Sequence, residues 1–218
     1  MRIEVEGTAD SLMGTNSYVV EDLDTHDAVI VDANLEPELA IEVVRRRGAR
    51  VRAILLTHTD FDHIAGLDRL RAEFGSVPVA VHPAELAFLR EGTPMRGQPG
   101  RPLPAPVEDP QTLEEGTPYR AGSLEFEVLH TPGHSPGGVT LKIENCLFTG
   151  DALFAGSVGR TDFPQSDTEL LMTGIEKSLM VQPDEFMVLA GHGPVSTIGQ
   201  ERRYNPFLRR PGGKQAPS

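Results

Sequence analysis

The segment Thr57–His63, with the sequence THTDFDH, constrains the fold of this chain more than any other feature. It follows an apolar run at 53–56 that is typical of a buried strand, and it precedes residues 64–70, whose spacing is typical of an amphipathic helix. Histidines and carboxylates packed this closely at a strand-to-helix junction are the usual components of a metal site. The simpler interpretation is that Asp60 or Asp62 only caps the helix.

Three later segments favour the metal site. In each, an apolar strand-like run ends, small residues turn the chain, and one side chain able to bind a metal follows: His134 in TPGHSPGG, Asp151 in LFTGD and His192 in AGHGP. Several separate strands that each deliver one ligand to a common edge are how an α/β sheet builds a binding site. The sequence therefore predicts that these side chains meet those of Thr57–His63.

Together, the blocks THTDFDH, TPGHSPGG, FTGDALFAGSVGRTDFP and AGHGPVSTIGQERRYNPF resemble the metallo-β-lactamase superfamily. The resemblance is strongest to its glyoxalase II-like (hydroxyacylglutathione hydrolase-like) branch, and it spans nearly the whole chain. It implies an α/β fold, namely a four-layer αββα sandwich of the metallo-β-lactamase type, with the metals at one rim of the two sheets. It also implies an enzyme, a metal-dependent hydrolase.

The resemblance implies two adjacent positions for divalent metal ions, with zinc as the expected metal and iron or manganese as alternatives. Carried over to this sequence, the first position is held by His58, residue 60 and His134. The second position is held by Asp62, His63 and His192. Asp151 bridges the two.

Position 60 departs from the family pattern, because Asp60 stands where a histidine is expected. Asp60 can still bind a metal through a carboxylate oxygen, and the more anionic site would then favour iron or manganese over zinc. Alternatively, Asp60 faces away, and the protein works with one metal or none. We favour ligation, because a carboxylate left unpaired beside other acids is costly.

The chemistry follows from these ligands. A divalent metal lowers the pKa of bound water from about 15.7 toward roughly 7, and it also polarises a carbonyl oxygen. Asp151 would position the hydroxide and Asp62 could share its proton, so both are predicted catalytic residues. A small-molecule thioester of glutathione or a related thiol is the expected substrate, because a thiolate leaves readily. Arg160 either binds an anionic end of the substrate or pairs internally with Asp162.

Two other functions remain open. The first is a persulfide dioxygenase of the same superfamily, which would hold one iron with two histidines and a carboxylate. His58, His134 and Asp151 could supply that triad. The second is a metal-poor, non-catalytic homologue, which the presence of Asp60 makes conceivable.

Composition narrows the possible partners and the compartment. The formal net charge of −12 argues against a nucleic-acid partner and against docking on anionic membranes. The 218 residues suit one domain over 1–210, followed by a disordered tail at 211–218. The single Cys146 lies in an apolar run and predicts a buried thiol in a reducing compartment. The N-terminus has no apolar signal core, so we expect a cytoplasmic protein. The sequence predicts no oligomeric state.

Periodicity and turn residues give the expected elements. Strands are predicted at 2–6, 17–21, 28–32, 51–56, 77–81, 123–130, 139–143, 146–149 and 186–190. Helices are predicted at 36–47, 62–74, 83–89, from 166 or 167 to 180, and at 200–204. Residues 14–16 form either a plain turn or a segment under the metal rim.

Residues 91–118 contain seven prolines, which break regular structure. A loop this long either covers the metal rim or is a flexible surface excursion.

Overall fold

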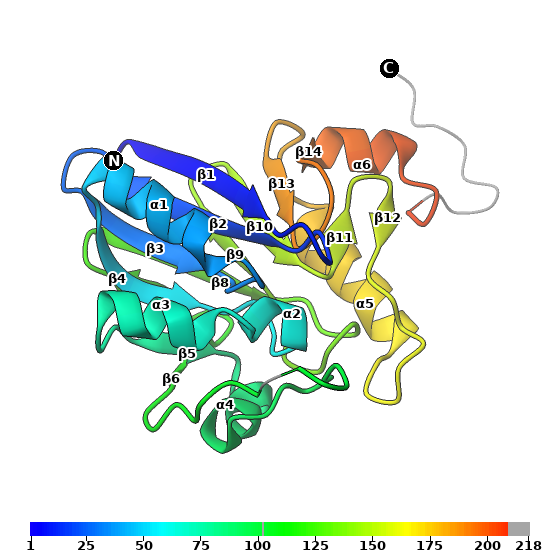
Figure 1. The fold of residues 1–218 in the computed structure, drawn as a ribbon. Helices are drawn as coiled ribbons and strands as arrows, with labels where there is room; N and C mark the ends of the chain where they lie inside the picture. The colour runs from blue at the N-terminus through cyan, green and yellow to red at the C-terminus, as the bar shows by residue number, and fades with distance from the viewer. Residues whose placement is uncertain (102, 209–218) are drawn as a thin grey trace.

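Two six-stranded sheets pack face to face at the centre of the structure, and helices cover their outer faces (Figure 1). The structure is a computed structural model that describes residues 1–101 and 103–208. The tail predicted to be disordered, 211–218, lies outside the described residues. No helix in the described part of the chain is long and apolar enough to cross a membrane.

The first sheet is antiparallel from β1 to β3 and parallel from β3 to β6. Its strands, in spatial order, are β1 (Ile3–Ala9), β2 (Asn16–Asp22), β3 (Asp27–Val31), β4 (Arg50–Leu55), β5 (Val79–Val81) and β6 (Gln111–Thr112). The second sheet contains one parallel pair, β10 with β13. Its order is β14 (Ser196–Thr197), β13 (Met187–Ala190), β10 (Cys146–Gly150), β9 (Val139–Ile143), β8 (Leu124–His130) and β7 (Tyr119–Ala121). A separate hairpin joins β11 (Leu153–Phe154) to β12 (Ser157–Val158).

The helices form the two outer layers. The first sheet is covered by α1 (Pro37–Arg47) and α3 (Leu67–Phe74), and the second by α5 (Thr168–Gly174), the π-helical turn Ile175–Leu179 and α6 (Ile198–Tyr204). Three short helices complete the fold: α2 (Phe61–Ile64), the 3-10 turn Pro83–Glu85 and α4 (Leu86–Glu91).

Strands buried on both faces explain the continuous apolar runs in the sequence. Along β3, Val29 and Val31 point between the two sheets, whereas Ala28 and Ile30 point toward the helices. Three hydrophobic clusters result, one between the sheets and one under each helical layer. The predicted αββα sandwich is therefore confirmed. Cys146 lies in the cluster between the sheets, 1% exposed, and burial raises the pKa of its thiol to about 11, which agrees with the predicted buried thiol.

The strand directions explain where the site forms. In the first sheet β3 and β4 are parallel, and in the second sheet β8, β10 and β13 run the same way. All five strands end at one rim of the sandwich, and each is followed by a segment that carries residues of the predicted site or contacts them.

Two expectations were wrong. The predicted helix 62–74 is two helices, α2 and α3, interrupted at Ala65 and Gly66. The chain breaks there because the backbone N–H of Gly66 donates to the carbonyl oxygen of Ala33 at 2.9 Å, which holds this turn against the end of β3. The proline-rich segment is not devoid of regular structure, since it contains β6, which pairs with β5.

The proline-rich loop is attached to the predicted metal motif. The N–H of Met95 donates to the carbonyl oxygen of Thr59 at 2.9 Å, and the N–H of Phe61 donates to that of Arg96 at 3.0 Å. Residues 95 and 96 of the loop therefore lie at the metal rim, and a role of the whole loop as a cover stays a prediction.

Glu85 ties two site-bearing loops together. Its side chain is 0% exposed, and its Oε2 accepts hydrogen bonds from the N–H and hydroxyl of Thr59 at 2.6 and 2.7 Å. Its Oε1 accepts from the Ser135 hydroxyl at 2.6 Å and the Gly137 N–H at 3.0 Å. Four donors satisfy this buried carboxylate, so it cross-links the loop after β4 to the loop after β8.

We expect Gly66→Ala to destabilise the fold by about 1–3 kcal/mol, because a Cβ there would lie 2.3 Å from the Asn34 carbonyl oxygen. Urea unfolding followed by circular dichroism measures the change. Gly97→Ala is the matched control, since its Cβ would meet nothing nearer than 3.5 Å. Equal urea midpoints for the two variants would contradict the close approach of residue 66 to the Asn34 carbonyl oxygen.

We expect Glu85→Gln to cost about 1–3 kcal/mol, because the amide places a donor against groups that are themselves donors. The same urea titration measures it. Glu91→Gln, on the neighbouring helix α4 and exposed, should leave the midpoint unchanged. A Glu85→Gln protein as stable as the parent would mean that the cross-link contributes nothing.

Candidate metal centre

The structure brings all seven predicted ligand residues to one place at the rim. Their ligand atoms form three groups, each with all atoms within 4.8 Å of one another. The groups are His58, His63 and Asp151; His58, Asp60 and His134; and Asp62, His63 and His192. The His192 side chain is the most open of the seven, at 29% exposed. The remaining histidines, His26, His82 and His130, belong to none of these groups.

Three of the histidines are oriented by a second layer of contacts. The Nδ1 of His63 faces Asp32 Oδ2 at 2.9 Å, and that of His134 faces the carbonyl oxygen of Arg160 at 2.8 Å. The Nδ1 of His58 lies 3.1 Å from the Thr57 hydroxyl, whose own proton goes to Asp32. Each Nδ1 therefore carries the hydrogen, and each Nε2 presents a lone pair to the centre, as metal-binding histidines do.

The spacing at the centre fits ligands of a metal. Two ligand atoms about 2.1 Å from a tetrahedral ion lie about 3.4 Å apart. The Nε2 of His63 is 3.3 Å from Asp151 Oδ1 and 3.7 Å from Asp62 Oδ2. The Nε2 of His192 is 3.2 Å from Asp62 Oδ2 and 3.6 Å from Asp151 Oδ2.

Buried polar atoms without a partner supply an independent test. Among the described residues, His58 Nε2, His63 Nε2 and Asp151 Oδ1 are buried and make no hydrogen bond. Buried polar atoms are normally satisfied, so their common orientation toward the centre requires a further partner. Imidazole nitrogens and a carboxylate oxygen are suitable donors for a divalent metal ion, so the residues present fit the group that the motif implies.

The charges of the centre favour a cation. Burial raises the pKa of Asp62, but the charge of His63 and hydrogen bonds from His192 and Thr15 outweigh it and hold that pKa well below its usual value. Burial lowers the pKa of His63, but nearby carboxylates, first Asp32, raise it well above its usual value. The raised pKa of His63 reports the negative field of the surrounding carboxylates, and the lowered pKa of Asp62 keeps that carboxylate ionised. An ionised carboxylate beside imidazole nitrogens stabilises a bound metal ion.

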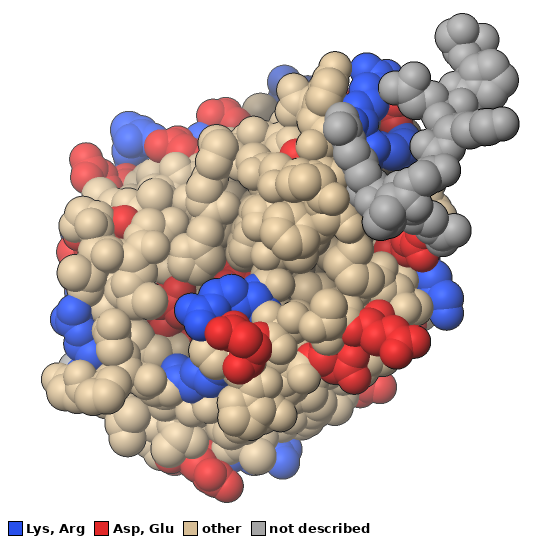
Figure 2. Space-filling model, turned by 90° about the vertical axis from the view of Figure 1, so that its right-hand side faces the viewer, with Lys and Arg blue, Asp and Glu red and all other residues tan. Residues whose placement is uncertain are grey.

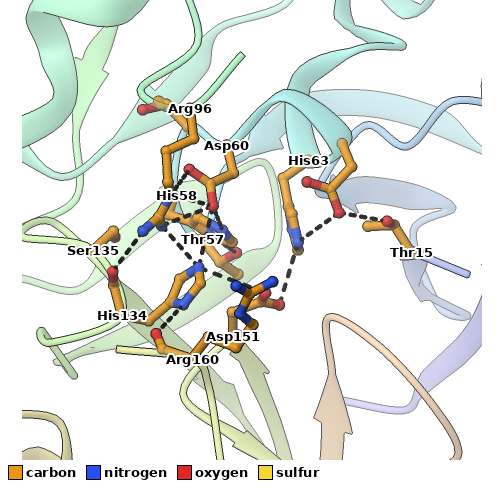
Figure 3. A network of polar contacts seen from close by, with 12 residues as sticks. Thr15, Thr57, His58, Asp60, His63, Arg96, His134, Ser135, Asp151 and Arg160 are labelled. Atoms are coloured by element: carbon orange, nitrogen blue, oxygen red, sulfur yellow. Dashed lines mark hydrogen bonds and ion pairs between the residues drawn. The ribbon is translucent and has the colours of Figure 1, made fainter. Parts of the chain in front are cut away.

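Asp60 faces the centre and does not turn away from it, and its role as a metal ligand stays a prediction. Its Oδ2 lies 3.1 Å from His134 Nε2 and 3.6 Å from His58 Nε2 (Figure 3). Burial raises the pKa of Asp60, but the contacts with His134, His58 and Arg96 lower it far more.

Arg96 is a residue of the site that the sequence interpretation missed. It lies in the proline-rich loop and forms an ion pair with Asp60 at 2.7 Å, beside His134 in Figure 3. No motif surrounds Arg96. The available signal was an extra carboxylate at position 60, which requires a cation nearby.

Thr15 and Asp32 also support the centre. The Thr15 hydroxyl donates to Asp62 Oδ2 at 2.7 Å, so the turn at 14–16 does lie at the metal rim. Asp32 accepts from the N–H of Thr57 at 2.8 Å, in addition to its contact with His63. Both side chains orient residues of the THTDFDH segment.

Arg160 pairs with Asp162, with nitrogen-to-oxygen distances of 3.0 and 2.8 Å. This is the internal pairing that the sequence left open as one interpretation. Its side chain is 69% exposed, so a role in binding substrate stays a prediction.

The comparisons with known proteins agree with this site. The chain is 38% identical over 189 residues to hydroxyacylglutathione hydrolase GloC of Haemophilus influenzae, covering 85% of this chain and 89% of that protein. It is 37% identical to the structure of BLEG-1 B3 metallo-β-lactamase, with a TM-score of 0.86 over 94% of this chain and 99% of that one. It is 35% identical to the structure of TTHA1623 in a di-iron-bound form, with a TM-score of 0.77 over 93% and 100%.

The family model of the metallo-β-lactamase superfamily matches residues 11–192, which include all seven predicted ligands. The chain therefore belongs to the metallo-β-lactamase superfamily.

Proposed function

We propose that this chain is a metal-dependent hydrolase that cleaves thioesters of glutathione or a related thiol. The observation that carries the proposal is the set of buried, unpartnered atoms His58 Nε2, His63 Nε2 and Asp151 Oδ1 that face the centre. The similarity to the hydroxyacylglutathione hydrolase of Haemophilus influenzae supports the choice of thioester.

A bound divalent ion supplies a water of lowered pKa and an electrophile for the carbonyl oxygen. Asp62, His63 and His192 would hold it at the second position, beside Asp151, and His58, Asp60 and His134 are the residues that the family pattern gives for the first. Zinc is the expected ion, and iron or manganese are the alternatives.

Asp62 and Asp151 are the carboxylates placed to orient the attacking water. The Thr15 hydroxyl holds Asp62 Oδ2 in position, and the lowered pKa keeps this carboxylate ionised at neutral pH. It can therefore accept a hydrogen bond from water and direct the oxygen lone pair toward the thioester carbon. The leaving group is a thiolate, whose conjugate thiol has a pKa of about 8.5, so the reaction needs no general acid to protonate it.

The surroundings of the centre suit a small organic substrate. The loop between β1 and β2 reaches His192 through a bridge from Thr15, and it exposes Leu12 and Met13. Val195, three residues after His192, is also exposed. The face seen in Figure 2 is largely uncharged, with a small group of basic and acidic side chains near its middle. The exposed Leu12, Met13 and Val195 are the apolar side chains that we propose contact the substrate, while Arg160 is the candidate for its anionic end.

The dioxygenase interpretation requires His58, His134 and Asp151 as ligands of one iron. In the structure, the Nε2 of His134 is 2.8 Å from a guanidinium nitrogen of Arg96. This contact competes with iron for His134 Nε2. Hydrolysis at the second position does not depend on that nitrogen.

We expect the purified, zinc-loaded protein to hydrolyse S-lactoylglutathione, and Asp62→Asn to lower kcat by about 100-fold or more. Loss of absorbance of the thioester measures the rate, and elemental analysis of both proteins shows how much metal each retains. A chelator should abolish the parent activity, and added zinc should restore it.

Two parallel assays separate the alternatives. Oxygen uptake with glutathione persulfide by the iron-loaded protein would favour the dioxygenase. Hydrolysis of a cephalosporin without hydrolysis of acyl thioesters would favour a β-lactamase, the activity in the name of the similar structure BLEG-1 B3 metallo-β-lactamase. Inactivity of the metal-loaded protein toward every acyl thioester tried would refute the proposal.

A further inference from the structure

We propose that the guanidinium of Arg96 takes the place of the first metal ion, so that this chain holds one divalent ion, at Asp62, His63 and His192 with Asp151. The inference rests on the proposed metal-dependent function but not on the thioester. It concerns how many ions bind and where.

The first argument is the lone pair of His134. Its Nδ1 faces the carbonyl oxygen of Arg160 at 2.8 Å, and a carbonyl only accepts, so Nδ1 carries the hydrogen. Arg96 Nη2 lies 2.8 Å from the Nε2 of the same ring, and because a guanidinium only donates, this nitrogen accepts through its one lone pair. One lone pair cannot bind both an N–H and a metal ion. The contact therefore removes His134 from the ligands of the first position.

The second argument is the pairing of Asp60. Both of its oxygens accept from Arg96 Nε, at 2.7 and 2.8 Å, and its Oδ2 is also 2.7 Å from Nη2. The carboxylate that stands in place of the expected histidine is thus neutralised by a guanidinium. A fork of this kind matches carboxylate geometry better than any other side chain.

The third argument is that the position of Arg96 is fixed from every side. Its Nη1 donates to the carbonyl oxygen of His134 at 3.1 Å and to the Ser166 hydroxyl at 3.2 Å. Its guanidinium carbon lies 4.3 Å from the ring centre of Phe163, and the side chain is only 15% exposed. The hydrogen bonds of Arg96 go to acceptors of Asp60, His134 and Ser166, so its guanidinium is engaged within the protein. We therefore interpret Arg96 as a replacement for the metal ion and not as an anchor for the substrate.

The second position keeps its ligands. Within the described residues, Arg96 makes no hydrogen bond or ion pair with Asp62, His63 or His192. His58 Nε2, His63 Nε2 and Asp151 Oδ1 have no hydrogen-bond partner there, and ligand atoms of these three residues lie within 4.8 Å of one another, so His58 can also face the single ion. One ion can therefore bind at this position while Arg96 stays in place.

The test is the number of metal ions per chain. The full-length protein and its variants are stripped with a chelator, titrated with Zn²⁺ and separately with Mn²⁺, desalted, and measured by elemental analysis. We expect one equivalent in the parent and two in Arg96→Met, because that change frees His134 Nε2 and Asp60. The double variant Asp60→His with Arg96→Met should also bind two.

Arg160→Met is the matched control. Arg160 lies 4.7 Å from the centre of the same Phe163 ring, but its side chain pairs with Asp162 and not with a ligand. This variant should still bind one equivalent. Circular dichroism confirms that each variant is folded.

Two further variants locate the ion. His134→Ala should keep the single equivalent, and His192→Ala should lose it. Two tightly bound equivalents in the parent protein would overturn the proposal, whatever the variants do. A single equivalent that His134→Ala removes and His192→Ala retains would overturn it as well. Because these readouts count metal, they stand apart from the outcome of the thioester assay.

Discussion

Two buried carboxylates, Asp60 and Asp62, and the partly buried Asp151 lie together at the rim, and the other contacts of the site depend on this concentration of negative charge. Ionised acids so close together and so far from water are unfavourable unless positive charge lies between them. At the first metal position this positive charge comes from Arg96, which forms an ion pair with Asp60. On the other side the imidazoles present lone pairs to the acids, and that arrangement is stable only around a cation.

The centre is held by two further buried carboxylates that do not face it. Asp32 binds the N–H of Thr57 and the ring of His63, and Glu85 binds Thr59 and Ser135. Both connect the THTDFDH segment to other strands or loops through hydrogen bonds that need no metal. The ligands are thus held in place before an ion arrives, and preorganisation of this kind raises metal affinity because little ordering is left for binding to impose.

The sequence predicted those parts of the molecule that depend on local patterns. Continuous apolar runs gave most strands, and the ligand residues follow strand ends in short turns of small residues, so they could be recognised without knowledge of the fold. Arg96, Glu85 and Thr15 could not be found in this way. Arg96 lies 36 residues from Asp60, and Thr15 lies 47 from Asp62, so only the folded chain brings each to its partner. The break at Gly66 was missed for the same reason, since it is caused by the distant Ala33 and Asn34.

Two main-chain hydrogen bonds, from the N–H of Met95 to the Thr59 carbonyl oxygen and from the N–H of Phe61 to the Arg96 carbonyl oxygen, limit how this loop can change in length. Surface loops ordinarily accept insertions and deletions freely. Here a change of length between α4 and Arg96 would shift the guanidinium out of register with Asp60, whereas the described residues 97–101 and 103–110 make no hydrogen bond with the ligands of the centre. Variation in loop length among descendants of this chain should therefore accumulate after Arg96, and residues 60 and 96 should be inherited as a pair.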